Sequence, residues 1–262
     1  MRDRLSLHIY FSFILRYFFE ISYKGTNYHG WQIQQNALSV QQVVQEALNT
    51  LLNRSIDIVG SGRTDAGVHA KRQYFHADIS EPLECSDFCY HLNAVLPEDI
   101  LVKSIRMVKE DAHARFDATS RTYYYRIIKQ KDPFLWNQAF IYHKELDIEK
   151  LNRASQLLVG NHDFESFSKV KTQVNNFICN VHFAQWMRSE QEVLFQIKAN
   201  RFLRGMVRAV VGTLLQVSEG KLDVDGISDI LKSKDRRQAG RSVPAEGLFL
   251  WQIEYPDHIF KN

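Results

Sequence analysis

Apolar–polar alternation and helical spacing follow one another along the whole chain, and this rhythm restricts the possible folds more than any other feature. Residues 17–23 alternate with a period of two, which predicts a strand. Ser39, with Gln42 three residues later, predicts the start of a helix whose apolar stripe runs to Leu52. The first half is expected to add a helix at 87–95 and strands at 56–59, 73–79, 100–108 and 121–128.

The second half repeats this rhythm. Asp147 predicts the start of a helix that ends before Gly160, and apolar helices are expected at 203–216 and 226–232. Residues 193–199 and 248–255 alternate as strands. Because neither half contains the long run of strand–helix units that a barrel needs, we predict an α+β fold with helices on one face of a largely antiparallel sheet.

The boundary between the halves carries no Pro-, Gly- or Ser-rich linker, so we expect the halves to share one continuous sheet. The strand pattern breaks near Pro133, and we therefore place an N-terminal half at residues 16–135 and a C-terminal half at residues 136–262. Residues 1–15 precede the first predicted strand and are expected to form an N-terminal extension.

Charge and cysteine content exclude several classes of protein. The formal net charge of +3 rules out a polybasic protein, but it leaves nucleic-acid binding open because binding depends on where charges cluster. Cys85, Cys89 and Cys179 form neither a disulfide framework nor a C-x-x-C pair, so they are predicted to be buried thiols in a reducing compartment. They also lack the spacing of a zinc site.

The N-terminal segment begins with arginines followed by apolar residues, which raises the question of a signal peptide. His8 and Arg16 interrupt the apolar run, and no small-residue cleavage site follows. The run is also shorter than the roughly 20 apolar residues that cross a bilayer. We therefore expect a soluble, cytoplasmic protein with no membrane partner.

The most informative segment is GSGRTDAGVHA, residues 60–70, which follows a predicted strand. A dinucleotide fingerprint would need glycine where Asp65 stands, and a P-loop would need Lys followed by Ser or Thr after Gly67. The segment fits neither. It is a tight loop that presents Arg63 and Asp65 between glycines, which let the backbone approach a ligand. From spacing alone, a structural turn with a surface arginine explains the loop about equally well.

Further motifs accompany this loop in a fixed order along the chain. They are YKG and GWQ (23–25, 30–32), LNAVLP (92–97), ARF (114–116), RTYYY (121–125), GNHDF (160–164), FLRGMVR (202–208) and AEGL (245–248). Together with GRTDAGVHA they resemble the tRNA pseudouridine synthases of the TruA type, over nearly the whole chain from about residue 16.

The resemblance implies an enzyme that isomerises uridine to pseudouridine at positions 38, 39 and 40 of tRNA, in the anticodon stem-loop. The reaction breaks the N1 glycosidic bond, rotates the base and rejoins it through C5. Neither redox chemistry nor phosphate transfer is involved, so no cofactor and no metal is expected. The resemblance also implies the pseudouridine synthase fold, in which two ferredoxin-like halves share a mainly antiparallel sheet with a central cleft.

Three candidate catalytic residues follow from the resemblance. Asp65 matches the family's nucleophile, a role that suits a carboxylate. Arg63 matches an active-site arginine, which could hold the carboxylate in its charged form, contact phosphate or fill the gap left by an extruded base. Tyr123 matches the active-site tyrosine that stacks on the flipped uracil. Alternation places Tyr123 and Tyr125 on one face of their strand and Tyr124 on the other.

Candidate tRNA-binding residues cluster elsewhere. Arg201, Arg204 and Arg208 share one side of the predicted helix by their spacing, and the FLRGMVR match favours Arg208 near the active site and Arg204 at a phosphate. Lys71 and Arg72 follow the catalytic loop and are further candidates, as are the C-terminal arginines 236, 237 and 241. His69 is expected to support the loop, and the segment 168–182 departs from the family pattern, which puts RNA contacts there in doubt.

Members of the family are homodimers, so a homodimer that binds tRNA is expected. Two copies could line one groove with basic residues although each chain carries only a small net charge. Two alternatives stand beside the enzyme: a catalytically silent RNA-binding relative, which would lack the aspartate, and a hydrolase that combines Asp65 with His69 or His162. The second lacks a partner carboxylate or serine motif near Asp65.

Overall fold

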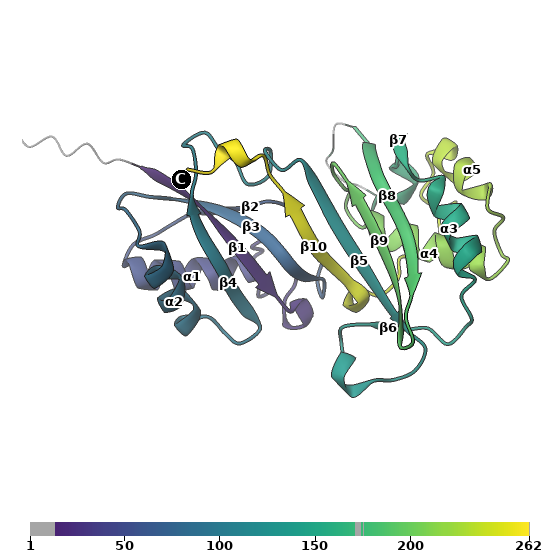
Figure 1. Cartoon of the computed structure of the whole chain (residues 1–262), viewed down its shortest axis with the longest axis horizontal. Coiled ribbons are helices and arrows are strands. Elements are labelled where there is room, and N and C mark those ends of the chain that lie inside the picture. The colour runs from purple at the N-terminus through teal and green to yellow at the C-terminus, as the bar shows by residue number, and fades with distance from the viewer. Residues whose placement is uncertain (1–13, 171–173, 175, 262) are drawn as a thin grey trace, which may run out of the picture.

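The computed structural model describes residues 14–170, 174 and 176–261, and in these residues the strands form one continuous sheet (Figure 1). Its order is β4-β1-β3-β10-β5-β9-β8-β7, with β2 beside β3 and β6 beside β5. The strands are β1 (Leu15–Tyr23), β2 (Ile58–Gly60), β3 (His69–Ile79), β4 (Ile100–Met107), β5 (Ser120–Ile128), β6 (Phe140–Ile141), β7 (Gly160–Asp163), β8 (Ile178–Arg188), β9 (Glu192–Ala199) and β10 (Leu248–Glu254). Only the β10–β3 and β5–β6 pairs of the described strands are parallel, so the shared, largely antiparallel sheet is confirmed.

Two groups of helices cover the same face of this sheet. The helices are α1 (Val40–Leu52), α2 (Cys85–Val95), α3 (Ile148–Gln156), α4 (Met206–Ser218) and α5 (Gly226–Ser233). Figure 1 shows α1 and α2 beside the early strands and α3, α4 and α5 beside the late ones. Tyr123 and Tyr125 point to one face of β5, and Tyr125 lies in the core beneath α4 while Tyr123 contacts the cores of both groups.

Each group of helices encloses its own core. The first core, under α1 and α2, contains Phe19, Leu48, Phe75 and Leu92. The second core, under α3 and α4, contains Leu151, Trp186, Phe195 and Val210. A smaller cluster around Phe18, Val108 and Ile259 lies on the opposite face of β1, because Phe18 alternates with Phe19. The two large cores meet at the central strands β5 and β10.

The helix starts follow from their capping residues. The Ser39 hydroxyl accepts the backbone N–H of Gln42 at 3.3 Å, as the sequence predicts. The side chain of Gln42 contacts Glu46 instead of returning to Ser39, so only half of the capping box forms. Asp147 caps α3 by accepting the N–H of Lys150 at 2.9 Å. No helix in the described part of the chain is long and apolar enough to cross a membrane.

Several elements differ from the sequence prediction. The helix expected at 203–216 begins only at Met206, because Gly205 before it takes a left-handed conformation with φ of 72°. Strand β8 was missed because its register shifts between Val181 and Phe183, which breaks the period of two. β7 was missed because it is only four residues long.

The C-terminal strand β10 pairs with strands of the predicted N-terminal half. β10, at the C-terminal end, lies between β3 and β5 and adds Leu250 and Ile253 to the first core. β1 begins at Leu15, which pairs with Ile79, so this residue of the expected extension belongs to the sheet. Residues 1–13 of that extension lie outside the described residues, and the boundary at 135 stays a prediction.

Candidate active site

The loop between β2 and β3 carries Asp65 and is held by its backbone. Gly30 has a φ of +88°, and a Cβ added there would lie 2.3 Å from the carbonyl oxygen of Thr64. Trp31 donates its N–H to the same oxygen at 3.4 Å, and the N–H of Gly67 reaches the carbonyl of Tyr28 at 3.2 Å. The segment after β1 therefore cradles the Asp65 loop at a distance that only glycine permits.

Buried polar side chains support the loop from below. The Tyr23 hydroxyl forms hydrogen bonds with Thr64 Oγ1 at 2.8 Å and with Gln73 Oε1 at 3.1 Å. Gln73 in turn donates to the carbonyl of Gly62 at 3.3 Å. Burial raises the pKa of Tyr23, so the phenol stays neutral and the loop rests on a hydrogen-bonded network without charge.

His69 connects this loop region to the C-terminal half. Its Nδ1 accepts the N–H of Gly25 at 3.0 Å, so the ring proton is assigned to Nε2, which donates to the carbonyl of Glu246 at 3.1 Å. The ring stacks on Phe249 with centroids 4.6 Å apart. Burial is the main cause that lowers the pKa of His69 to about 4, and the imidazole is therefore neutral at pH 7. The geometry agrees with the supporting role expected for His69.

Asp65 meets two arginines from the other half of the molecule. Arg208 Nη1 lies 3.3 Å from Asp65 Oδ2, and Arg204 Nε lies 3.9 Å from Asp65 Oδ1. The side chain of Asp65 is 29% exposed, whereas that of Arg204 is 61% exposed. A partly exposed carboxylate thus lies at the junction of the two halves, with a cation close to one of its oxygens.

Backbone contacts fix Arg208 in the first turn of α4. Its Nε donates to the carbonyl of Val243 at 2.7 Å, which leaves Nη1 directed at Asp65. The segment around Val243 lies close to α4 because Gly212 has no side chain. A Cβ at Gly212 would lie 1.8 Å from the carbonyl oxygen of Arg241.

The predicted helical face of arginines is wrong in part. Arg201 and Arg204 lie in the connection before α4, and only Arg208 lies on the helix. The left-handed Gly205 delays the helix, and the N–H of Lys169 holds the carbonyl of Arg204 at 2.9 Å. Arg204 and Arg208 nevertheless both reach Asp65, because the connection turns back toward the loop.

Arg63 does not lie in an ion pair with Asp65, contrary to one of its expected roles. Its side chain is exposed, and it has no ion-pair partner among the residues that the structure describes. Arg208 and Arg204 occupy the place beside the carboxylate that the sequence assigned to Arg63. The roles of Arg63 at a phosphate or in the gap left by an extruded base stay predictions.

Tyr123 lies between the two large cores, on the same face as the helices. Its ring packs edge-on against Phe202 with centroids 5.0 Å apart. Burial is the main cause that raises the pKa of Tyr123 to about 12, with Arg121 lowering and Asp65 raising it. Tyr124 points to the other face and contacts Trp251, so the alternation predicted for the three tyrosines is confirmed.

Lys71 and Arg72 are placed differently from each other although they are neighbours in sequence. Arg72 Nε lies 2.9 Å from Glu20 Oε1, and this carboxylate also accepts the Tyr74 hydroxyl at 2.9 Å. Lys71 is exposed and has no ion-pair partner within the described ranges. Arg72 is therefore occupied within the protein, whereas Lys71 is available.

Arg121 is a residue of the site to which the sequence assigned no role. Its two Nη atoms donate to four backbone carbonyls, those of Ala118 at 2.9 Å, Asn200 at 2.8 Å, Ser61 at 3.4 Å and Arg115 at 2.7 Å. One guanidinium thus joins the start of the Asp65 loop to the start of the Arg204 connection. Backbone acceptors leave no mark in a sequence, and only the RTYYY match pointed to this position.

The hydrolase alternative needs a histidine that acts as a base beside Asp65. Both ring nitrogens of His69 are engaged, as described above, and His162 lies on β7 with Nε2 at 2.9 Å from the carbonyl of Val159. Neither histidine is hydrogen-bonded to Asp65, whose partners among the described residues are Arg208 and Arg204. Across the described residues, no group of three or more His, Cys, Asp or Glu side chains could hold a metal ion.

Cys179 is buried, but Cys85 and Cys89 are only half-buried, so the prediction of buried thiols is wrong for these two.

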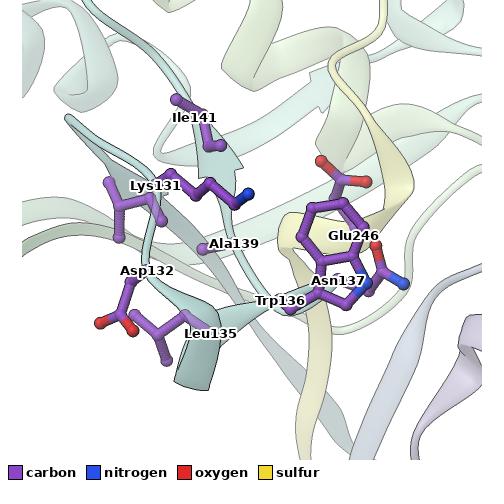
Figure 2. A pocket seen from close by; sticks show the side chains of 9 residues that line it. Lys131, Asp132, Leu135, Trp136, Asn137, Ala139, Ile141 and Glu246 are labelled. Carbon is purple, nitrogen blue, oxygen red and sulfur yellow. The ribbon is translucent and has the colours of Figure 1, made fainter.

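A small pocket lies between the segment 131–141 and Glu246 (Figure 2). Figure 2 shows Glu246, Trp136 and Asn137 on one side of it and Lys131 on another. Its volume of about 80 Å³ is below the roughly 300–1,000 Å³ of small-molecule sites. Neither Asp65 nor Tyr123 lines it, so we do not assign the pocket to the candidate active site.

Comparisons with known proteins agree on one family. The sequence profile described as tRNA pseudouridine synthase matches residues 21–117 and 154–256. A tRNA pseudouridine synthase A of Bacteroides thetaiotaomicron is 48% identical over 250 residues, which cover 94% of this chain and 93% of the relative. That of Porphyromonas gingivalis is 47% identical over 249 residues, with 94% and 99% covered. That of Haemophilus ducreyi is 40% identical over 241 residues, with 91% and 92% covered.

Proposed function

The chain belongs to the tRNA pseudouridine synthase family, and we propose that Asp65 is the nucleophile with which it isomerises uridine to pseudouridine in tRNA. The observation that carries this assignment is the placement of Asp65. Its carboxylate is partly exposed on a loop fixed through the backbone, and Arg208 of the other half holds one of its oxygens at 3.3 Å. The α+β sheet with helices on one face is the fold of this family.

The reaction changes no oxidation state. The N1–C1′ bond breaks, the base rotates, and a C5–C1′ bond forms, while C5 loses a proton and N1 gains one. A carboxylate serves this chemistry because it forms a covalent bond to the substrate and leaves again afterwards. Attack on C1′ of the ribose and attack on C6 of the base both need such a carboxylate.

Tyr123 is the residue that receives the flipped base in this proposal. Its ring lies between the two cores beside Phe202, where an aromatic face can stack on uracil. The pKa of about 12 keeps the hydroxyl protonated at pH 7, so it acts on the base as a hydrogen-bond donor. Arg63 contacts the RNA around the extruded nucleotide in this proposal, which is supported by its exposure on the same loop as Asp65.

The substrate uridines in this proposal are positions 38, 39 and 40 of the anticodon stem-loop, and the enzyme acts in the cytoplasm as a homodimer. The chain's basic side chains near the site support an RNA substrate. Arg204 is largely exposed beside Asp65, and Lys71, on the strand that follows the loop, is exposed and forms no ion pair with a described residue. A homodimer would bring two such sets of cations to one tRNA.

The decisive experiment uses tRNA that carries tritium at C5 of uridine. Isomerisation exchanges that hydrogen with water, so the wild-type protein should release the label without added metal or nucleotide. Asp65→Asn should release it at least about 1,000-fold more slowly. The matched control is Asp163→Asn. It removes an aspartate on β7 that forms an ion pair with Lys234 at 2.9 Å. Mapping of the modified positions should find 38, 39 and 40.

Each result decides one part of the proposal. Release by Asp65→Asn at the wild-type rate would show that another residue is the nucleophile. Release by neither protein, together with intact tRNA binding by both, would favour the silent RNA-binding relative. Modified uridines outside the anticodon stem-loop would leave the chemistry in place and correct the substrate.

A further inference from the structure

The guanidinium of Arg121, which has no carboxylate partner among the described residues, lies at the edge of the candidate active site. Arg121 is half-buried, and its four carbonyl partners come from three separate segments of the chain. Burial is the main cause that lowers the pKa of Arg121, and Arg115 and Arg201 lower it further. A positive charge that is buried without a counter-ion costs free energy unless other interactions compensate for it.

Two more arginines, Arg115 and Arg201, lie close to Arg121. Arg121 Nη2 holds the carbonyl of Arg115 at 2.7 Å, and Nη1 holds the carbonyl of Asn200, directly before Arg201, at 2.8 Å. Arg201 has a neutral partner, because its Nη1 donates to Asn176 Oδ1 at 3.1 Å. None of the three arginines forms an ion pair with any described residue.

Hydrogen bonds fix the turn that carries Arg115, and this turn exposes an aromatic ring. His76 Nδ1 accepts the N–H of Ala114 at 3.2 Å, and the Tyr255 hydroxyl donates to the carbonyl of Ala114 at 2.5 Å. Phe116 nevertheless has 73% of its surface exposed. Its ring lies 4.3 Å from that of His113 and beneath the guanidinium of Arg115, which is 5.6 Å from its centroid.

We propose that Arg115, Phe116 and Arg201 form an RNA-contact site in which the arginines bind phosphate and Phe116 stacks on a base. The site rests on the proposed function, because it serves the tRNA whose uridine reaches Asp65. Cations without acidic partners, beside a rigid exposed aromatic ring, are what a polyanion with flat bases requires. A fixed turn also spares the ordering cost that a mobile loop would pay on binding.

The position of the site relative to Asp65 follows from Arg121. The carbonyl of Ser61 begins the Asp65 loop, and the carbonyl of Asn200 begins the connection that leads to Phe202 and Arg204. Both bind the same guanidinium, so the RNA-contact site and the nucleophile share one rigid frame. An RNA strand held at Arg115 and Arg201 therefore has its register fixed relative to the flipped uridine.

The arginines are tested by the salt dependence of tRNA binding. Arg115→Ala and Arg201→Ala should each reduce the slope of log Kd against log salt concentration by about one, because each removes one phosphate contact. Arg115→Lys keeps the charge and should retain the wild-type slope. Wild-type slopes in both alanine variants would overturn the proposal.

The aromatic ring is tested by affinity at a fixed salt concentration. Phe116→Ala should weaken tRNA binding about 5- to 100-fold with the slope unchanged, because stacking involves no counter-ion. The matched control is Phe134→Ala, which removes a phenylalanine that is 91% exposed on a different loop. An equal loss in both variants, or no loss in Phe116→Ala, would overturn the proposal.

Two further readouts separate this site from the proposed function and from a protein interface. Tritium release should be the same in the wild type and in the control Phe134→Ala, so a wild-type protein that never releases tritium refutes the function and leaves the binding result to judge the site. A change in sedimentation without a change in tRNA affinity would make the surface a contact between protein chains and would overturn the RNA assignment.

Discussion

The first half of the chain holds Asp65 through its backbone, whereas the second half reaches the same carboxylate with side chains. Gly30 and Gly67, both at positive φ, bring the loop against the segment after β1. Arg208 and Arg204 approach from α4 and the connection before it. The proposed nucleophile must stay in one place, which backbone contacts achieve, while its partners act through charge, which side chains supply.

The largest effect should come from removing the closer side-chain partner. Arg208→Met leaves Arg204, whose Nε is 3.9 Å away, as the one ion-pair partner of Asp65 among the described residues, so the rate of tritium release should fall about 100- to 1,000-fold. Affinity for tRNA should change by less than about threefold. Single-turnover rates and filter binding measure the two quantities.

Arg188→Met is the control for this change. Its guanidinium also binds a backbone carbonyl, that of Leu146 at 2.7 Å, but from β8 and without contact to Asp65. It should release tritium at the wild-type rate. If Arg208→Met lost affinity and rate in equal measure, the arginine would belong to tRNA binding, and the division between the halves would be wrong.

A backbone contact of the first half should be nearly as sensitive. Gly30→Ala adds a methyl group 2.3 Å from the carbonyl oxygen of Thr64 at a φ of +88°. We expect a loss of about 3 kcal/mol or more in the free energy of unfolding, since strain and overlap add. Urea unfolding of the whole chain measures it.

Gly220→Ala separates the two causes of that loss. Gly220 also has a positive φ, +71°, but an added Cβ would meet nothing within 4 Å. It should lose only the roughly 1–2 kcal/mol of the left-handed conformation. Equal losses in the two variants would mean that the close approach to the Asp65 loop does not matter.

The elements with unbroken periodicity were predictable, and those with an irregular residue were not. Strand 17–23 and the helix after Ser39 were predicted because apolar residues recur in the sequence with the period of a strand and of a helix, although Tyr17 to Ile21 are all buried in the structure. The start of α4 and the whole of β8 were missed, because a left-handed glycine and a register shift leave no signal in hydrophobic spacing. The α+β class was nevertheless correct, since it depends on the order of elements and not on their ends.

The candidate site was predictable only where side chains carry it. Asp65, Tyr123 and Arg208 were found through motifs, and the structure brings Asp65 and Arg208 together. Arg63 was expected beside Asp65, but neighbours in a tight loop point in different directions. Arg121 was given no role, because its partners are carbonyl oxygens that every residue possesses.

A pH effect should distinguish the histidine that joins the halves from one that does not. Burial lowers the pKa of both His69 and His76 to about 4, while the unfolded chain keeps the usual 6.5. The unfolded state therefore binds more protons between these values, and each histidine costs stability as the pH falls from about 6.5 toward 4. At pH 5 the cost is about 2 kcal/mol for each.

His69→Gln and His76→Gln should each reduce the stability difference between pH 7.5 and pH 5, measured by urea unfolding. Protonation of His69 at Nδ1 removes the acceptor for the Gly25 N–H, while Nε2 keeps its bond to Glu246, so the ring loses its contact with the segment after β1 and tritium release should fall with pH in the wild type and in His76→Gln alike. His76 bonds Ala114 within the first half. If His76→Gln alone removed the acid loss of activity, the connection through His69 would not matter for catalysis.

The smallest effect tests whether the first half contacts tRNA with side chains close to the Asp65 loop. Lys71→Ala removes an exposed cation without an ion-pair partner among the described residues, and the slope of log Kd against log salt should fall by about one. Arg72→Ala removes a cation that already pairs with Glu20 at 2.9 Å, and Kd should change by less than about twofold with the slope unchanged. Salt titrations of tRNA binding measure both.

The same slope change in the two variants would show that the ion pair with Glu20 opens to bind RNA. No change in either would confine the first half's part in the site to its backbone and the side chains of the loop itself.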